Sequence, residues 1–278
     1  MNRLSKTERA RIITALVEGN SVRATCRMTG AAKGTVLKLL TDLGNACARY
    51  QDEKLRNLPC KRIQCDEIWA FCYAKEKNVP EEMKGRFGFG DVWTWTAIDA
   101  DTKLGVSWLV GERSIPYASK FMSDVASRLA HRVQLTTDGH KAYLRAVEKA
   151  FGSEIDYAML EKIYTAPPQA DGVTRYSPAE CCGARRLKVT GNPDLAHVST
   201  SFAERQNLTM RMSMRRFTRL TDAFSKKVEN LKHSVALHFM HYNFVKVHQT
   251  LRVTPAMEAG VSDHVWSMEE LAGLLDSN

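Results

Sequence analysis

The sequence contains no hydrophobic run long enough to cross a membrane. A spanning helix needs roughly 20 consecutive apolar residues, and no stretch of these 278 residues approaches that length. The opening segment, MNRLSKTERARII, is charged throughout and lacks the apolar core of a signal peptide. We therefore expect no membrane partner and a cytoplasmic location.

Paired cysteine motifs are also absent. The seven cysteines are odd in number and form no C-x-x-C pair, so the sequence indicates neither a disulfide framework nor a zinc ribbon. We expect reduced, mostly buried thiols. The adjacent Cys181 and Cys182 lie in an irregular stretch, which leaves metal binding or oxidation of this pair open.

The charge is unbalanced toward the positive sign. Forty Lys and Arg against thirty-one Asp and Glu give a net charge of +9, while a hydrophobic content of 44% is ordinary for a globular protein. A basic surface favours a polyanionic partner, because binding releases the counterions of that partner. Basicity alone does not identify nucleic acid, since many basic proteins have other partners.

The N-terminal segment predicts three short helices. Ser5 and Glu8 have the spacing of a capping box, and Ser21 can cap a second helix that ends near Gly30. A third amphipathic segment, AAKGTVLKLLTDLG, follows at once.

Short helices joined by a glycine-containing turn are typical of a helix-turn-helix, whose last helix enters the DNA major groove. We therefore expect a small all-α helix-turn-helix domain over residues 1–48. Lys33, Thr35 and Lys38 lie on the exposed side of its last helix and are the candidate DNA contacts. The alternative is a helical bundle that does not touch DNA. The polar residues 49–60 predict a linker.

From Lys61 the pattern changes to that of an α/β domain. Strand-forming and helical segments alternate in the order β-β-β-α-β-α-β, which is the order of a ribonuclease-H-like fold with a mixed five-stranded sheet and flanking helices. We assign residues 61–250 to this domain, with an irregular basic insertion at about 166–196 and a C-terminal tail at 251–278. The expected strands are 63–74, 92–99, 104–111, 133–138 and 157–164; the expected helices are 117–131, 141–151, one from Ser201, and 223–247.

Three acidic residues occupy the places in this fold where a metal site can form. Asp66 lies in the middle of the first strand, Asp138 ends the fourth, and Glu204 lies on a late helix. Two divalent ions about 4 Å apart activate an oxygen nucleophile and neutralise charge during phosphodiester cleavage. Carboxylates that converge from different elements suffice to hold Mg²⁺.

Each acidic residue also has a structural interpretation. Asp138 before Gly139 is a common way to end a strand in a turn, and Glu204 can complete a capping box with Ser201. A charged residue within an apolar strand is costly when buried and unpaired, which favours a functional role for Asp66. Strand alternation puts Asp66 and Glu67 on opposite faces, so we expect only one of them to join a site.

Taken together, the motifs between residues 65 and 248 resemble the DDE transposases of the insertion-sequence-one type. The C-terminal run FSKKVENLKHSVALHFMHYNFVKVH resembles the last helix of that family. The other motifs are D-E-x-W (Asp66, Glu67, Trp69), W-x-x-x-A-x-D (Trp93 to Asp99), G-E-R-S (Gly111 to Ser114), T-D-G (Thr137 to Gly139) and E-R-x-N-L-x-x-R (Glu204 to Arg211).

This resemblance implies a transposase that cleaves DNA and transfers the cut strand. It implies that Asp66, Asp138 and Glu204 are the catalytic, metal-binding triad, with Mg²⁺ as the expected ion and Mn²⁺ as a substitute. The expected partners are double-stranded DNA, as transposon ends and target, and further copies of the chain in a homo-oligomer on DNA. A zinc finger expected at the N-terminus of such relatives is missing here, which puts the mode of end recognition in doubt.

Helical spacing places Asn207 and Arg211 on the face of Glu204, where both are candidate contacts to the scissile backbone or the transposon end. The other arginines nearby, Arg205, Arg215, Arg216 and Arg219, are expected to hold phosphates or to be solvated. Two other functions remain open: a different integrase or nuclease of the same fold, and a transposase-derived regulator that binds DNA without catalysis.

Overall fold

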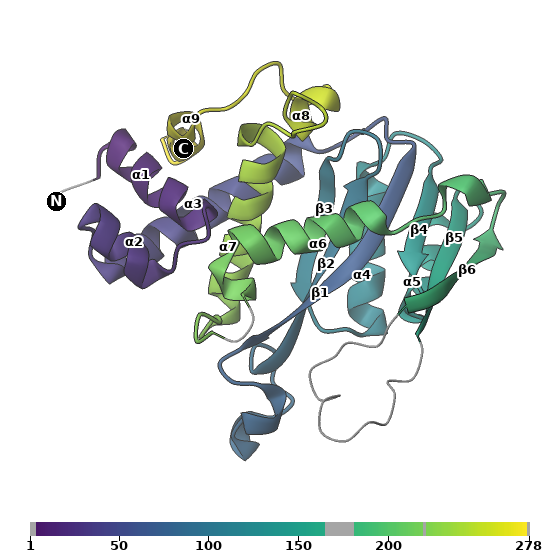
Figure 1. Ribbon diagram of the computed structural model, residues 1–278, viewed down its shortest axis with the longest axis horizontal. Helices are drawn as coiled ribbons and strands as arrows, with labels where there is room; N and C mark the ends of the chain where they lie inside the picture. The colour runs from purple at the N-terminus through teal and green to yellow at the C-terminus, as the bar shows by residue number, and fades with distance from the viewer. Residues whose placement is uncertain (1–3, 165–180, 219–220, 277–278) are drawn as a thin grey trace.

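The computed structural model describes residues 4–164, 181–218 and 221–276. Its centre is a mixed six-stranded sheet with the strand order β3-β2-β1-β4-β5-β6 and helices on both faces (Figure 1). The predicted β-β-β-α-β-α-β succession is present, and a sixth strand follows it. The strands are β1 (Arg62–Cys72), β2 (Gly90–Asp99), β3 (Gly105–Gly111), β4 (Gln134–Asp138), β5 (Asp156–Tyr164) and β6 (Cys181–Thr190).

The pairing of β1 creates the edge on which the acidic residues lie. β1 pairs along its length with antiparallel β2, but parallel β4 pairs only with residues 62–65 of β1. Because β4 ends at Asp138, its carboxyl end lies next to the middle of β1. Asp66 follows directly after Cys65, the last residue of β1 that pairs with β4. The sheet topology therefore brings Asp66 and Asp138 side by side.

Helices cover the sheet on both sides. Helices α4 (Ile115–Arg128) and α5 (Ala142–Phe151) lie behind it in Figure 1, and α6 (Ser201–Ser213) crosses in front. The faces of α4 and α5 that pack on the sheet are apolar and include Phe121 and Tyr143, both fully buried with Trp95 of β2. Burying a large apolar side chain contributes about 1.5 to 3 kcal/mol, so this layer stabilises the sheet behind the acidic edge.

The three N-terminal helices are those that the capping residues predict. They are α1 (Lys6–Val17), α2 (Val22–Thr29) and α3 (Lys33–Lys54). Ser5 and Glu8 form the capping box of α1, and the Ser21 hydroxyl accepts the N–H of Ala24 at the start of α2. Gly30 ends α2 with φ 74°, a left-handed conformation that glycine adopts without strain.

Helix α3 is longer than predicted, which corrects the assignment of residues 49–60 as a linker. It continues to Lys54 and packs against α7 (Val228–Met240). Gln51 donates from Nε2 to the carbonyl oxygen of Ala236 at 3.0 Å. A Cβ added at Gly44 would lie 2.5 Å from the Cβ of His233, so the two helices approach closely there. The N-terminal helices are therefore joined to the rest of the protein by packing.

The regions predicted as an insertion and a tail also contain regular structure. Residues 181–190 form β6, which pairs antiparallel with β5, whereas 166–180 lie outside the described residues. Within 251–276, the short helices α8 (Pro255–Glu258) and α9 (Met268–Gly273) follow α7 and its π-helical extension His241–Val245. Arg9 of α1 pairs with Asp276 at 2.7 Å, so the end of the chain packs on its beginning. The remaining elements are the 3-10 turns Glu76–Asn78, Glu81–Met83, Leu195–His197 and Arg215–Phe217.

Two expectations that concern the whole chain can be compared with the described residues. All seven cysteines are free, four of them are buried, and Cys181 and Cys182 are exposed. Among the described helices, none combines the length and the apolar composition that a membrane crossing requires.

Candidate metal and DNA-processing site

Asp66 is the best-anchored acidic residue of the site. Its Oδ1 accepts the backbone N–H of Glu67 at 2.8 Å, and its Oδ2 accepts Nδ2 of Asn207 at 2.8 Å. Burial raises the pKa of Asp66 to about 6, and the negative charges of Asp138 and Glu204 add to this rise. The carboxylate is therefore held in one orientation in a place where its charge is unfavourable without a cation.

Asp138 takes part in a turn and in the acidic cluster. One oxygen, Oδ1, accepts the backbone N–H of His140 at 3.0 Å, which is the strand-ending turn that the sequence suggested. The other, Oδ2, lies 3.7 Å from Nη2 of Arg113. The structural interpretation of Asp138 is thus correct, and it coexists with a position beside Asp66.

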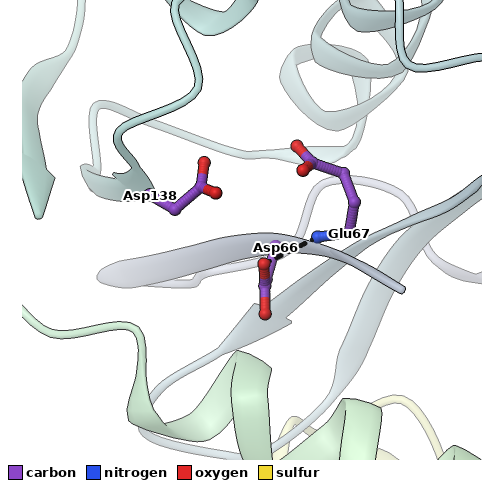
Figure 2. A group of neighbouring side chains, drawn as sticks. All are labelled: Asp66, Glu67 and Asp138. Carbon is purple, nitrogen blue, oxygen red and sulfur yellow. Dashed lines mark hydrogen bonds between the residues drawn. The ribbon is translucent and has the colours of Figure 1, made fainter. Parts of the chain in front are cut away.

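Glu67 is the residue that sequence reasoning missed. One ligand oxygen each from Asp66, Glu67 and Asp138 lie within 4.8 Å of one another. Figure 2 shows Asp66 and Glu67 on opposite sides of β1, as alternation predicts, with the carboxylate of Asp138 on the Glu67 side. Because Asp138 ends its strand beside β1, both neighbours lie close to it. The expectation that only one of them joins a site stays a prediction.

The surroundings of Glu67 are largely closed to solvent. Its side chain is 1% exposed and pairs with Nε of Arg113 at 3.2 Å. Burial raises the pKa of Glu67 to about 7, with a further rise from Asp138, while Tyr143 and Arg113 oppose it. Oε1 of Glu67 and the Tyr143 hydroxyl are buried, and neither has a hydrogen bond with good geometry among the described residues. Oε1 of Glu67 is therefore free to act as a ligand atom for a cation.

Glu204 lies near the cluster but outside it. Its charge raises the pKa of Asp66, yet its Oε1 pairs with Nζ of Lys162 at 2.6 Å and accepts the hydroxyl of Thr200 at 2.5 Å. The residue before α6 is Thr200, and the capping box with Ser201 considered from the sequence does not form. Lys162 thus neutralises the carboxylate that the resemblance assigns to the triad.

The predicted DNA contacts divide into buried and exposed residues. Asn207 is 4% exposed and donates to Asp66, a positioning contact that the sequence did not reveal. Arg211 is half-buried one turn further along α6. On α3, Lys33 and Lys38 are exposed and Thr35 is half-buried, with Lys38 paired to Asp42 at 2.8 Å.

The donor set fits a hard divalent cation. Mg²⁺ and Mn²⁺ prefer carboxylate oxygens, and sulfur or imidazole ligands are typical of softer metals. Among the described residues, the group Asp66, Glu67 and Asp138 is the one whose ligand atoms are close enough to hold an ion. Burial is the main cause of the raised pKa values of Asp66 and Glu67, and the negative charge of Asp138 adds to both.

Comparisons with known proteins add two distant structural likenesses. No protein-family model matches the sequence, and no curated protein matches it. A piggyBac transposase synaptic complex with hairpin DNA aligns at 10% identity and a TM-score of 0.41, covering 97% of this chain and 70% of that one. The Mos1 strand transfer complex aligns at 12% identity and a TM-score of 0.24, covering 56% of this chain and 59% of that one. At these TM-scores neither likeness supports an inference about what this chain binds or does.

Proposed function

We propose that this protein is a DDE transposase with a ribonuclease-H-like core that cleaves DNA and joins the cut strand of an insertion sequence in a metal-dependent reaction. The observation that carries the proposal is the cluster of Asp66, Glu67 and Asp138, whose ligand oxygens lie within 4.8 Å although β1 supplies two of them and β4 the third. The motif resemblance between residues 65 and 248 independently selects two of these three carboxylates. It also selects Glu204, which lies on the helix that crosses this edge.

In this proposal Asp66 and Asp138 hold the metal, with Glu204 as the third member of the triad. Two bound Mg²⁺ ions, or Mn²⁺ in their place, would activate an oxygen nucleophile and neutralise charge at the scissile phosphate. Asn207 fixes the orientation of the Asp66 carboxylate through its 2.8 Å hydrogen bond. Glu67 adds a carboxylate outside the triad, on the side of β1 opposite to Asp66.

Arg113 has a separate task in the metal-free protein. Its guanidinium lies 3.2 Å from Glu67 and 3.7 Å from Asp138, and it also covers the ring of Trp93 at 4.9 Å. One cation thus offsets part of the repulsion between two carboxylates. The G-E-R-S motif contained this residue, but nothing in the sequence indicated its partners.

DNA binding is proposed at the N-terminal helices, which we interpret as a helix-turn-helix with Lys33, Thr35 and Lys38 on its recognition helix. A cleft of about 810 Å³ is lined by residues of these helices, of α7 and of the segment before α7. Among the described residues that line this cleft are six cations and one carboxylate, Asp222; the cations are Arg23, Lys33, Arg215, Arg216, Lys226 and Lys227. Such an imbalance suits a phosphate backbone, whose counterions are released on binding.

The deciding experiment is a strand-transfer assay with a labelled transposon end and Mg²⁺ or Mn²⁺. The variants Asp66→Asn, Asp138→Asn and Glu204→Gln keep shape and remove the charge that holds the ions, so each should bind DNA and fail at both cleavage and joining. Asp101→Asn is the matched control, because Asp101 pairs with Arg62 outside the cluster.

Three results would contradict parts of this proposal. Cleavage without joining by the wild type would indicate a nuclease of the same fold. Full strand transfer by Asp138→Asn would show that the wrong aspartate has been chosen. Retention of DNA binding with no metal-dependent chemistry in the wild type would indicate a DNA-binding protein without catalysis.

A further inference from the structure

A second cleft, of about 650 Å³, lies along the part of β1 that extends beyond β4. Three half-buried aromatic side chains line it. The rings of Trp69 and Phe71 are 5.8 Å apart, and those of Phe71 and Phe224 are 4.6 Å apart, measured between centroids. Trp69 and Phe71 are alternate residues of one strand, so they present their rings on the same face. The result is a short aromatic stripe open to solvent.

Arg216 lines the same cleft and forms no ion pair with a carboxylate of the described residues. Its Nη1 donates to the hydroxyl of Ser225 at 2.9 Å. Burial lowers the pKa of Arg216, and the one group that opposes this effect is the thiol of Cys72. Arg216 is half-buried, and a partly shielded guanidinium without an anion is less stable than one that is paired.

The other shielded arginines of this protein show the contrast. Arg128 pairs at 2.8 Å with both Asp52 and Asp124, and Arg9 pairs with Asp276 at 2.7 Å. Arg216 alone of these three lacks such a partner within the part of the chain described here. Its position is therefore suited to an anion supplied from outside.

The remaining charges of the cleft have the same sign. Lys75 and Lys77 line it and are exposed, and the opposing charge is the single carboxylate of Asp222. Lys226 adds a further cation, since its Nζ lies over the ring of Phe224 at 3.7 Å from the ring centroid. An apolar peptide would fill the aromatic stripe but would leave the charge of Arg216 unpaired.

The cleft also lies beside the acidic cluster. Trp69 follows Glu67 by two residues on the same face of β1, which corresponds to about 7 Å at the rise of a strand. A DNA strand that passes the carboxylates therefore reaches the cleft within a short distance.

We propose that this cleft binds one unpaired nucleotide of the DNA strand, with its base on the stripe of Trp69, Phe71 and Phe224 and its phosphate at Arg216. Aromatic side chains stack on any base, and arginine neutralises the phosphate, which is the usual chemistry of single-strand binding. The inference rests on the proposed function, because it places a DNA strand at the carboxylates. It adds a subsite that would favour distorted or frayed DNA over a fully paired duplex.

The test compares two DNA probes by fluorescence anisotropy in EDTA, so that binding is measured without chemistry. The probes are a labelled single strand of twelve thymidines and a labelled blunt duplex of twelve base pairs. Trp69→Leu, Phe224→Leu and Arg216→Gln are the test variants, each checked for cooperative thermal unfolding. Arg145→Gln, an exposed arginine on α5, is the matched control for loss of charge.

We expect Trp69→Leu and Phe224→Leu to weaken single-strand binding about fivefold or more, with less than about a twofold effect on the duplex. Arg216→Gln should weaken single-strand binding and lower the slope of log K against log salt by about 0.7, the contribution of one phosphate. The aromatic variants should leave that slope unchanged. Two aromatic positions are tested, so the subsite can still be examined if one of the two variants does not fold.

Equal losses on both probes by the aromatic variants, or no loss by them on the single strand, would overturn the subsite. Arg216 also lines the cleft proposed for duplex binding, so a single-strand salt slope unchanged by Arg216→Gln is the result that would remove it from the subsite. These outcomes are separate from the strand-transfer assay. An inactive wild type that still shows the selective single-strand defects would contradict the transposase proposal and leave the nucleotide site in place.

Discussion

Replacing the charge of Asp66 should make the metal-free protein more stable while it abolishes the proposed chemistry. Burial and the neighbouring charges raise the pKa of this carboxyl from 3.8 to about 6. A tenfold change in proton affinity corresponds to about 1.4 kcal/mol. The ionised carboxylate therefore costs the folded state up to about 3 kcal/mol at pH 7.

Asp66→Asn removes this cost but also disturbs the hydrogen bonds from Asn207 and from the backbone of Glu67. We expect a net gain of about 1 to 3 kcal/mol in the free energy of unfolding, or a rise in Tm of roughly 3 to 8 °C. The measurement is thermal unfolding in EDTA at pH 7.

The pH dependence supplies the sharper test, because the sign is fixed by the direction of the pKa change. The folded-state pKa is raised, so the penalty is fully present above about pH 6 and disappears as the pH falls through the folded and then the unfolded value. The advantage of Asp66→Asn over wild type should therefore shrink between pH 7 and pH 4. An advantage that is absent at pH 7, or that stays constant down to pH 4, would refute this account of Asp66.

Asp101→Asn is the control, and its expected change in Tm has the opposite sign. The hydrogen bond from Arg62 lowers the pKa of Asp101, so loss of that carboxylate should lower Tm at pH 7. Added Mg²⁺ should also raise the Tm of the wild type and not that of Asp66→Asn, because an ion that binds only the intact site stabilises only that protein.

Three further changes test other parts of the structure. Lys33→Glu or Lys38→Glu should weaken binding to the cognate DNA end and lower the salt slope by about 1 or more, while Lys149→Glu on α5 should not; equal loss of metal-dependent nicking on non-specific DNA would contradict a separate binding surface. Arg113→Gln should lower the free energy of unfolding by up to about 1 kcal/mol in EDTA, and Mg²⁺ should restore most of that loss. An equal Tm for wild type and Arg113→Gln in EDTA would contradict the charge-balancing role of Arg113. Gly44→Ala should lower stability by about 1 to 3 kcal/mol in denaturant unfolding, because its Cβ would collide with α7; an unchanged midpoint would show that the helices can separate there at no cost.

The sequence predicted best those elements whose signals are local. The capping box of Ser5 and Glu8 and the cap at Ser21 both occur at the expected helix starts. Strands β2, β4 and β5 begin and end within about two residues of their expected limits, because turns and alternating side chains mark them. The places of Asp66 on β1 and of Asp138 at the end of β4 followed from the same signals.

The elements that were missed depend on partners distant in the chain. Residues 49–54 are polar on the surface, and their helical state is supported by the contact of Gln51 with α7, which no local pattern reveals. Strand β6 is rich in exposed basic residues, and the antiparallel pairing with β5 holds it in place instead of an apolar face. Glu67 and Asp138 lie close together because β4 stops pairing with β1 at Cys65. The sequence around either residue does not reveal where that pairing ends.

The position of Glu204 depends on how α6 is attached to β1. Oε1 of Gln64 accepts the backbone N–H of Phe202 at 2.8 Å, and Asn207 donates to Asp66, so the helix is tied to β1 on both sides of Glu204. A helix anchored at two points within five residues cannot swing away without breaking both contacts. The contact that separates Glu204 from the acidic cluster is then its ion pair with the half-buried Lys162. Completion of the proposed triad therefore requires Glu204 to exchange its side-chain partners, the ammonium of Lys162 and the hydroxyl of Thr200, for a metal ion, with α6 left in place.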